Sequence, residues 1–197
     1  MISFADTAPP ENVTVNGTEY AVNYDFRVWA DISGLIREFA YNSSDEGDQL
    51  NNFELIAQIE QLAFGRIINE PWQNVFDSIV KFLCGYPHED NGYKQQEDDS
   101  RKLYSFKHDM AYIILAIRNQ SGIDLSYRRK EPFHWWLFLL EFQSLEERHY
   151  ICSLMRRRAY DGNDRELCKL RDSVALPPEY SRSEKAAIQQ LINDFGG

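Results

Sequence analysis

The stretch VTVNGTEYAVNYDFRVW, residues 13–29, contains both structural types that we expect in this chain. Its first part has an alternating pattern typical of β-strands, carried by Tyr20, Val22 and Tyr24. Asn16-Gly17 accepts the positive φ angles of a type I′ turn, which predicts a hairpin. From Asp25 the period becomes helical, and Asp25 is placed to cap the helix. Because two strands alone are only marginally stable, the hairpin must pack on a helical body.

The rest of the chain shows apolar residues at helical spacing. We expect helices near 50–64, from Pro71 to about 84, near 110–117 and from Pro132 to about 142. Ser144 and Glu147 have the spacing of a capping box, which predicts a further helix from 144 to about 158. The predicted fold class is therefore mainly α, a multi-helix bundle-like domain with an N-terminal β-hairpin.

Polar segments divide the chain. We expect residues 1–11 to be a disordered N-terminus and residues 12–160 to form the hairpin plus helical domain. Within that domain, 86–102 is rich in Gly, Asn, Asp and Gln, which predicts a flexible loop. Residues 161–197 are expected to form a polar linker and a C-terminal amphipathic helix, which a second capping box at Ser181 and Glu184 would open.

The composition limits the classes of function. Of 197 residues, 43% are hydrophobic and 14% aromatic, enough to build a core. The formal net charge of -10 disfavours binding to nucleic acid or an anionic membrane. The start of the chain has no signal-peptide pattern, and the longest apolar run, 133–140, is too short to span a bilayer. Three cysteines without a C-x-x-C pair predict neither a disulfide framework nor a zinc site, and favour a reducing compartment.

No catalytic, cofactor-binding or metal-binding residues are predicted, because the short motifs that carry such chemistry are absent from the sequence. The run 156–158 of three arginines could contact phosphate, but a basic helix end is the favoured interpretation. The aromatic run 133–142 is expected in the core, with partial exposure as a binding face as the alternative. An enzyme would require convergence of some of Asp109, Asp124, His108 and His134.

Several ordered motifs in residues 13–158 resemble one known family. The hairpin followed by Asp25-Phe26-Arg27 and Trp29 is similar to its opening. The later motifs fall in the family's order and are Phe106-Lys107-His108-Asp109, Tyr112-Ile113, Gly122-Ile123-Asp124-Leu125, His134-Trp135-Trp136 and Phe138. The family is the bacteriophage gene-product-fifteen family of tail assembly chaperones, typically encoded beside the tape measure gene.

The resemblance implies a non-enzymatic protein of the host cell cytoplasm, absent from the mature virion, that binds the tape measure protein and keeps it soluble during tail tube assembly. Its further implied partners are the tail tube protein and a neighbouring chaperone product, and avidity along an extended client would favour self-association. The alternative is a structural tail completion or head-tail joining protein. The residues expected at fold or assembly surfaces are Phe26, Arg27, Trp29, His134, Trp135 and Trp136.

Overall fold

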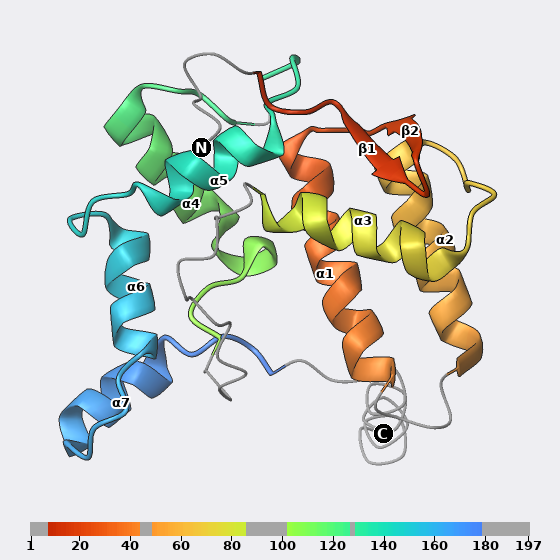
Figure 1. Cartoon of the computed structure of the whole chain (residues 1–197). Helices are drawn as coiled ribbons and strands as arrows, with labels where there is room; N and C mark the ends of the chain where they lie inside the picture. Colours follow the sequence, from red (N-terminus) through yellow and green to blue (C-terminus); the bar gives the residue numbers. More distant parts are fainter. Residues whose placement is uncertain (1–7, 44–48, 86–101, 127–128, 179–197) are drawn as a thin grey trace, which may run out of the picture.

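The central element is a long helix, α1, with other helices on both sides of it (Figure 1). A computed structural model describes residues 8–43, 49–85, 102–126 and 129–178. The elements are β1 (Asn12–Val15), β2 (Thr18–Ala21), α1 (Phe26–Ser43), α2 (Gln49–Phe64), α3 (Trp72–Cys84), α4 (Phe106–Ser121), α5 (Trp135–Gln143), α6 (Tyr150–Arg158) and α7 (Arg165–Ser173). This mainly helical fold with an N-terminal antiparallel hairpin confirms the predicted fold class.

The hairpin has the predicted turn. Val15 pairs with Thr18, and between them Asn16 and Gly17 have φ angles of 49° and 80°. Two consecutive positive φ angles are those of a type I′ turn, which Asn-Gly adopts with little strain. The hairpin packs on α3, where the Ser78 hydroxyl donates to the Thr14 carbonyl.

The core lies where α1 meets α2, α4 and α5 (Figure 1). On α1 the buried positions include Phe26, Trp29 and Ile32, one helical turn apart. The predicted α2 and α3 begin and end close to their expected bounds, and Gly65 and Gly122 end α2 and α4 with positive φ. Periodicity therefore located the middle of the fold well.

Two predicted helix starts are wrong. Pro132 does not open a helix, because His134 is extended and pairs with Asp25, just before α1, so that α5 begins at Trp135. Ser144 and Glu147 do not form a capping box either. Ser144 closes α5 instead, with its hydroxyl donating to the Glu141 carbonyl, and α6 begins only at Tyr150.

The terminal regions also differ from expectation. The predicted polar linker contains α7, where the Asp164 carboxylate accepts hydrogen bonds from the backbone N–H groups of Glu166 and Leu167. At the other end, where disorder was expected up to residue 11, the Glu11 carbonyl accepts from the Val22 N–H at 2.9 Å. The C-terminal helix predicted after Ser181 and the loop predicted at 86–102, apart from its last residue, lie outside the described residues.

Candidate assembly site

The six residues expected at fold or assembly surfaces meet at one place, which we call the aromatic junction (Tyr24–Trp29 with Phe133–Trp136). The Phe26 N–H donates to the Phe133 carbonyl at 2.9 Å, and the Trp135 N–H donates to the Tyr24 carbonyl at 2.8 Å. These two bonds pair the segments that precede α1 and α5 as a short antiparallel bridge. Two motifs more than 100 residues apart in sequence therefore form one contact.

The aromatic rings of the junction are mostly buried. Phe26, Trp29 and Trp135 are each at most 1% exposed. Phe26 stacks on Phe138, with ring centroids 4.7 Å apart, and Trp29 packs on Phe82 at 4.4 Å. Burial of these large side chains contributes to stability chiefly through the hydrophobic effect, so these three residues hold the fold rather than present a free surface.

Two indole groups tie the end of α3 to this junction. The Trp135 indole N–H donates to the Leu83 carbonyl at 2.9 Å, and that of Trp136 donates to the Phe82 carbonyl at 2.8 Å. Carbonyls in the last turn of a helix have no partner within that helix. The two consecutive tryptophans that open α5 thus donate hydrogen bonds to carbonyls in the last turn of α3.

His134 caps α5 and joins it to the N-terminal segment. Its Nδ1 accepts from the Trp136 N–H at 3.0 Å, so Nε2 carries the proton of the neutral ring and donates to the Pro10 carbonyl at 2.9 Å. The ring also stacks on Tyr24, with centroids 5.3 Å apart. Burial lowers the pKa of His134, since it disfavours the charged imidazolium. His134 is therefore a packed histidine that makes two hydrogen bonds.

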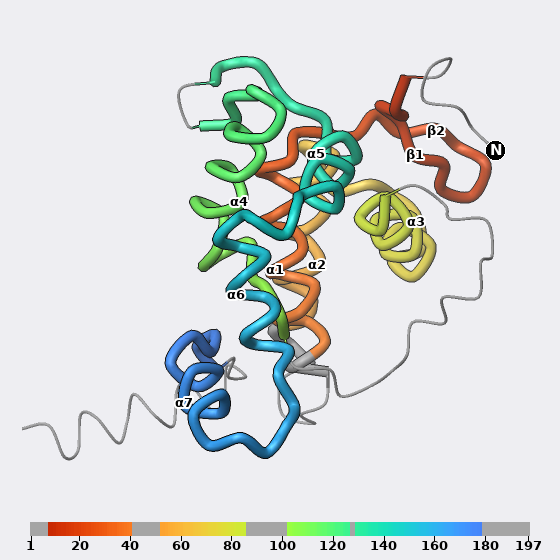
Figure 2. Tube along the Cα trace, turned by 90° about the vertical axis from the view of Figure 1, so that its left-hand side faces the viewer, coloured from red at the N-terminus to blue at the C-terminus, as the bar shows by residue number. Residues whose placement is uncertain are grey.

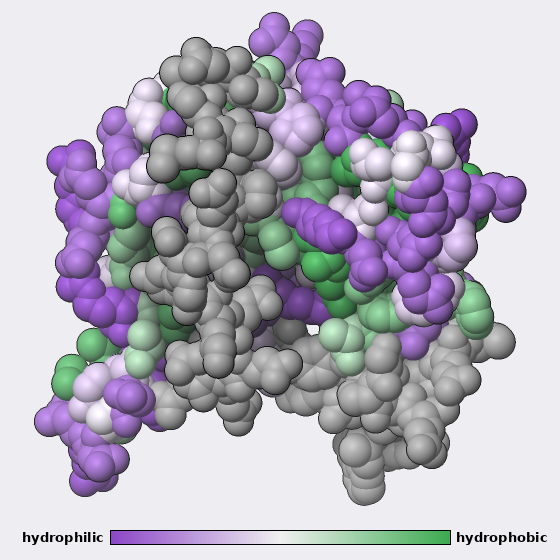
Figure 3. Space-filling model, in the orientation of Figure 1, coloured by the Kyte–Doolittle hydropathy of each residue, from purple (hydrophilic) through white to green (hydrophobic). Residues whose placement is uncertain are grey.

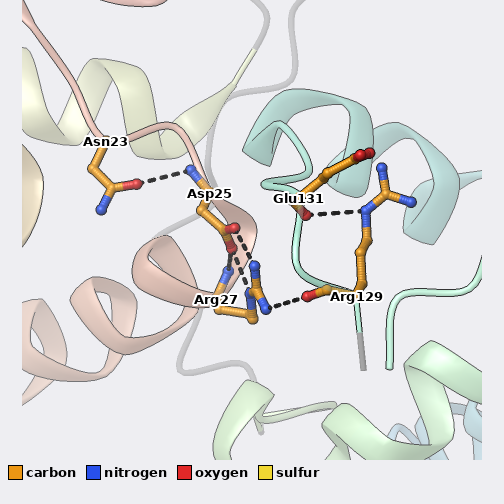
Figure 4. Close-up of polar contacts among 5 residues, drawn as sticks. All are labelled: Asn23, Asp25, Arg27, Arg129 and Glu131. Atoms are coloured by element: carbon orange, nitrogen blue, oxygen red, sulfur yellow. Dashed lines mark hydrogen bonds and ion pairs between the residues drawn. The ribbon is translucent and has the colours of Figure 1, made fainter. Parts of the chain in front are cut away.

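Arg27 and Asp25 form the polar side of the junction (Figure 4). Asp25 accepts from the Arg27 backbone N–H at 2.9 Å and from its Nε at 2.8 Å, while Arg27 Nη1 donates to the Arg129 carbonyl at 3.1 Å. Burial raises the pKa of Asp25, but the hydrogen bonds and positive charge of Arg27 outweigh it, and the net pKa is lowered. The side chain of Arg27 is 41% exposed, although all three of its nitrogens already donate to Asp25 or to the Arg129 carbonyl.

Sequence reasoning missed a second polar contact, between Asp109 on α4 and Arg158 on α6. Arg158 Nη1 lies 2.7 Å from Asp109 Oδ2, and Nη2 lies 3.1 Å from Oδ1, in a buried bidentate pair. The arginine run was interpreted as a basic helix end, yet Arg158 is inside the protein. The available signal was Asp109 itself, because an acid on the same helix face as Phe106 and Ile113 needs a partner.

The four residues considered for an enzyme site are in different surroundings. Asp109 is engaged by Arg158, and His134 by Pro10 and Trp136. His108 and Asp124 are exposed. Within the described ranges, no group of three or more His, Cys, Asp or Glu side chains is arranged to hold a metal ion.

Several large apolar side chains are exposed, and these could contact another protein. On α4 and α6 they are Tyr112, Leu115 and Tyr150, and on α7 they are Leu167 and Leu170. Helix α7 has no buried residue, and hydrophobic atoms show on the lower-left lobe that it forms in Figure 3. Surfaces of this kind are where soluble proteins contact partners. The exposed set was not identified from sequence, because helical spacing cannot tell which apolar stripe is covered.

One comparison, with models of protein families, gives a match for this chain. In the part of the chain that the structure describes, no helix is both long and apolar enough to cross a bilayer. No curated protein and no solved structure matches the chain. A family described as Bacteriophage Gp15 protein matches residues 5–176, which include α7 and extend beyond the resemblance seen at 13–158. This chain belongs to the bacteriophage Gp15 protein family.

Proposed function

We propose that this protein is a tail assembly chaperone that binds the tape measure protein and keeps it soluble in the host cell cytoplasm. Membership of the Gp15 family implies a phage structural or assembly-related protein. The observation that carries the finer proposal is the set of exposed apolar side chains on α4, α6 and α7, above all Leu115 and Tyr150, each 53% exposed. Exposed apolar side chains on helices suit a helical client.

The proposed role needs binding surfaces and no active site. The aromatic junction would keep the helices rigid, while α4, α6 and α7 would contact the client. Since the tape measure protein is long, several copies could bind along it, and avidity would compensate for modest affinity at each site. The tail tube protein and a neighbouring chaperone product are further partners in this proposal.

Co-expression with the tape measure protein of the same phage tests the proposal. We expect the tape measure protein to move into the soluble fraction and to copurify with this chain. A tape measure protein that stays equally insoluble, with no complex recovered, would refute the chaperone function.

A tail completion or head-tail joining protein is the other assembly role compatible with the family. The two roles differ in what happens to the protein after assembly. Mass spectrometry of purified virions should find a chaperone absent or strongly depleted. Recovery of this chain in a fixed ratio to known tail proteins would instead support the structural role.

A further inference from the structure

One exposed surface combines apolar and positively charged side chains, and we call it the α4–α6 face (Lys107, Tyr112, Leu115, Arg118 and Tyr150). Figure 2 looks onto the side of the molecule where α4 and α6 lie next to each other. The rings of Tyr112 and Tyr150 meet edge to face, with centroids 5.0 Å apart. Leu115 follows Tyr112 by one helical turn and is on the same side of α4. The three apolar side chains therefore form one patch across two helices.

The charges on this face are unusual for an acidic protein. The acidic residue of α4 is Asp109, and Arg158 neutralises it inside the core. The exposed charged residues of α4 are thus Lys107 and Arg118, both positive, although the whole chain has a net charge of -10. Helix α6 has the sequence YICSLMRRR and adds no acid. The charged side chains that α4 exposes therefore have the opposite sign from the protein as a whole.

Lys107 and Arg118 are at the two ends of the patch. They are 11 residues apart, or about 16 Å along α4 at 1.5 Å per residue, and Tyr112 and Leu115 lie between them along the axis. Round the helix, both cations lie on the side of Leu115 opposite to Tyr112. A helix of about three turns has the same length. Acidic side chains near both ends of such a helix could reach the two cations while its apolar stripe covers the patch.

We propose that the α4–α6 face binds an amphipathic helix of another polypeptide, one whose apolar stripe is flanked at both ends by Asp or Glu. This inference rests on the proposed function in taking the occupant to be a client protein. A second copy of this chain fits less well, because a two-fold interface through this face would bring Lys107 and Arg118 against the same cations of the partner. Nucleic acid fits less well, because two separated cations neutralise few phosphates while the whole chain carries a net charge of -10.

The direct test is binding of the full-length chain to two synthetic amphipathic peptides of three to four turns. Both have the same leucine stripe, one with Glu at both ends and the other with Lys. We expect the Glu peptide to bind at least about tenfold more tightly than the Lys peptide, which corresponds to about 1.4 kcal/mol. Its binding should weaken as the salt concentration is raised. Equal binding of the two peptides would overturn the proposed charge preference.

Variants locate the binding on the surface. Leu115→Asp should weaken binding of the Glu peptide about tenfold or more, because it places a negative charge in the patch that repels the peptide's own. Phe53→Asp is the matched control, because Phe53 is an exposed apolar residue of another helix, α2, and we expect no loss of binding. A loss in Phe53→Asp as large as in Leu115→Asp would show that binding is not confined to this face.

Charge reversal provides a second test. Combining Lys107→Glu with Arg118→Glu should reverse the preference, so that the Lys peptide binds more tightly. The control is Lys81→Glu on α3, which should keep the preference of the native chain. If the double variant still prefers the Glu peptide, the two cations do not select the partner.

These results can be separated from the proposed function. If Leu115→Asp still solubilises the tape measure protein in co-expression, the chaperone function stands and this face is not its binding site. If the native chain binds the Glu peptide yet fails to solubilise the tape measure protein, the face stands and the chaperone function fails.

Discussion

Replacing Arg158 with alanine should destabilise the protein more than any other change in the arginine run. Asp109 and Arg158 have side chains that are 3% and 8% exposed, so both charges are shielded from water. Arg158 also donates to the Leu103 carbonyl at 3.0 Å and to the Val174 carbonyl at 2.7 Å. Arg158→Ala leaves Asp109 buried with one backbone donor, from Ser105, and removes the donor from both carbonyls.

The magnitude follows from removing the hydrogen-bonded charge partner of a buried carboxylate. Removing one partner of a buried ion pair costs about 3–5 kcal/mol. Arg156 is the matched control, because it is on the same helix and pairs with Glu147 at 3.0 Å on the exposed surface. Arg156→Ala should cost less than about 1 kcal/mol.

Urea unfolding followed by circular dichroism measures both variants on one scale. We expect a large drop in the unfolding midpoint for Arg158→Ala and little change for Arg156→Ala. Arg158→Lys should be intermediate, because it keeps the charge and loses the bidentate geometry. Combining Asp109→Asn with Arg158→Met should be less destabilising than Arg158→Ala, since no buried charge remains. If Arg158→Ala and Arg156→Ala unfold within 1 kcal/mol of each other, the reasoning about the buried pair is wrong.

Two glycines and one histidine give further predictions. Gly17→Ala should destabilise the protein by about 1 kcal/mol, because an L side chain is strained at its φ of 80°, whereas exposed Gly34→Ala within α1 should stabilise by about 0.5–1 kcal/mol. Thermal unfolding should show a lower midpoint for Gly17→Ala and a higher one for Gly34→Ala. Midpoints that shift in the same direction would contradict the backbone argument. The lowered pKa of His134 means that the unfolded state binds a proton more readily, so stability should fall as pH decreases from about 7 through the ordinary value of 6.5. His134→Gln should make stability less dependent on pH, and His108→Gln should not. Unfolding at several pH values measures the slope of stability against pH. An unchanged slope in His134→Gln would exclude His134 as the source of this pH dependence.

Six residues of the family motifs were predicted from sequence to belong to fold or assembly surfaces. The structure brings all six to the aromatic junction. The sequence could not tell which of them would be covered. In the run 133–142 apolar residues occur all around the helix, so periodicity does not separate Trp135, which is buried, from Leu140, which is exposed. That difference depends on which neighbouring helix covers each side.

The sequence alone determined the features that depend only on residues close together in the chain. Asn16-Gly17 specified the hairpin turn, and the apolar period specified the middle of α1 to α4, because backbone preferences and helix faces are local properties. Tertiary structure decided what depends on distant residues. The start of α5 was set by pairing with residues 24–26, and Arg158 became a core residue because Asp109, 49 positions earlier, is buried opposite it. Such contacts form only when the whole chain packs, and no local pattern specifies them.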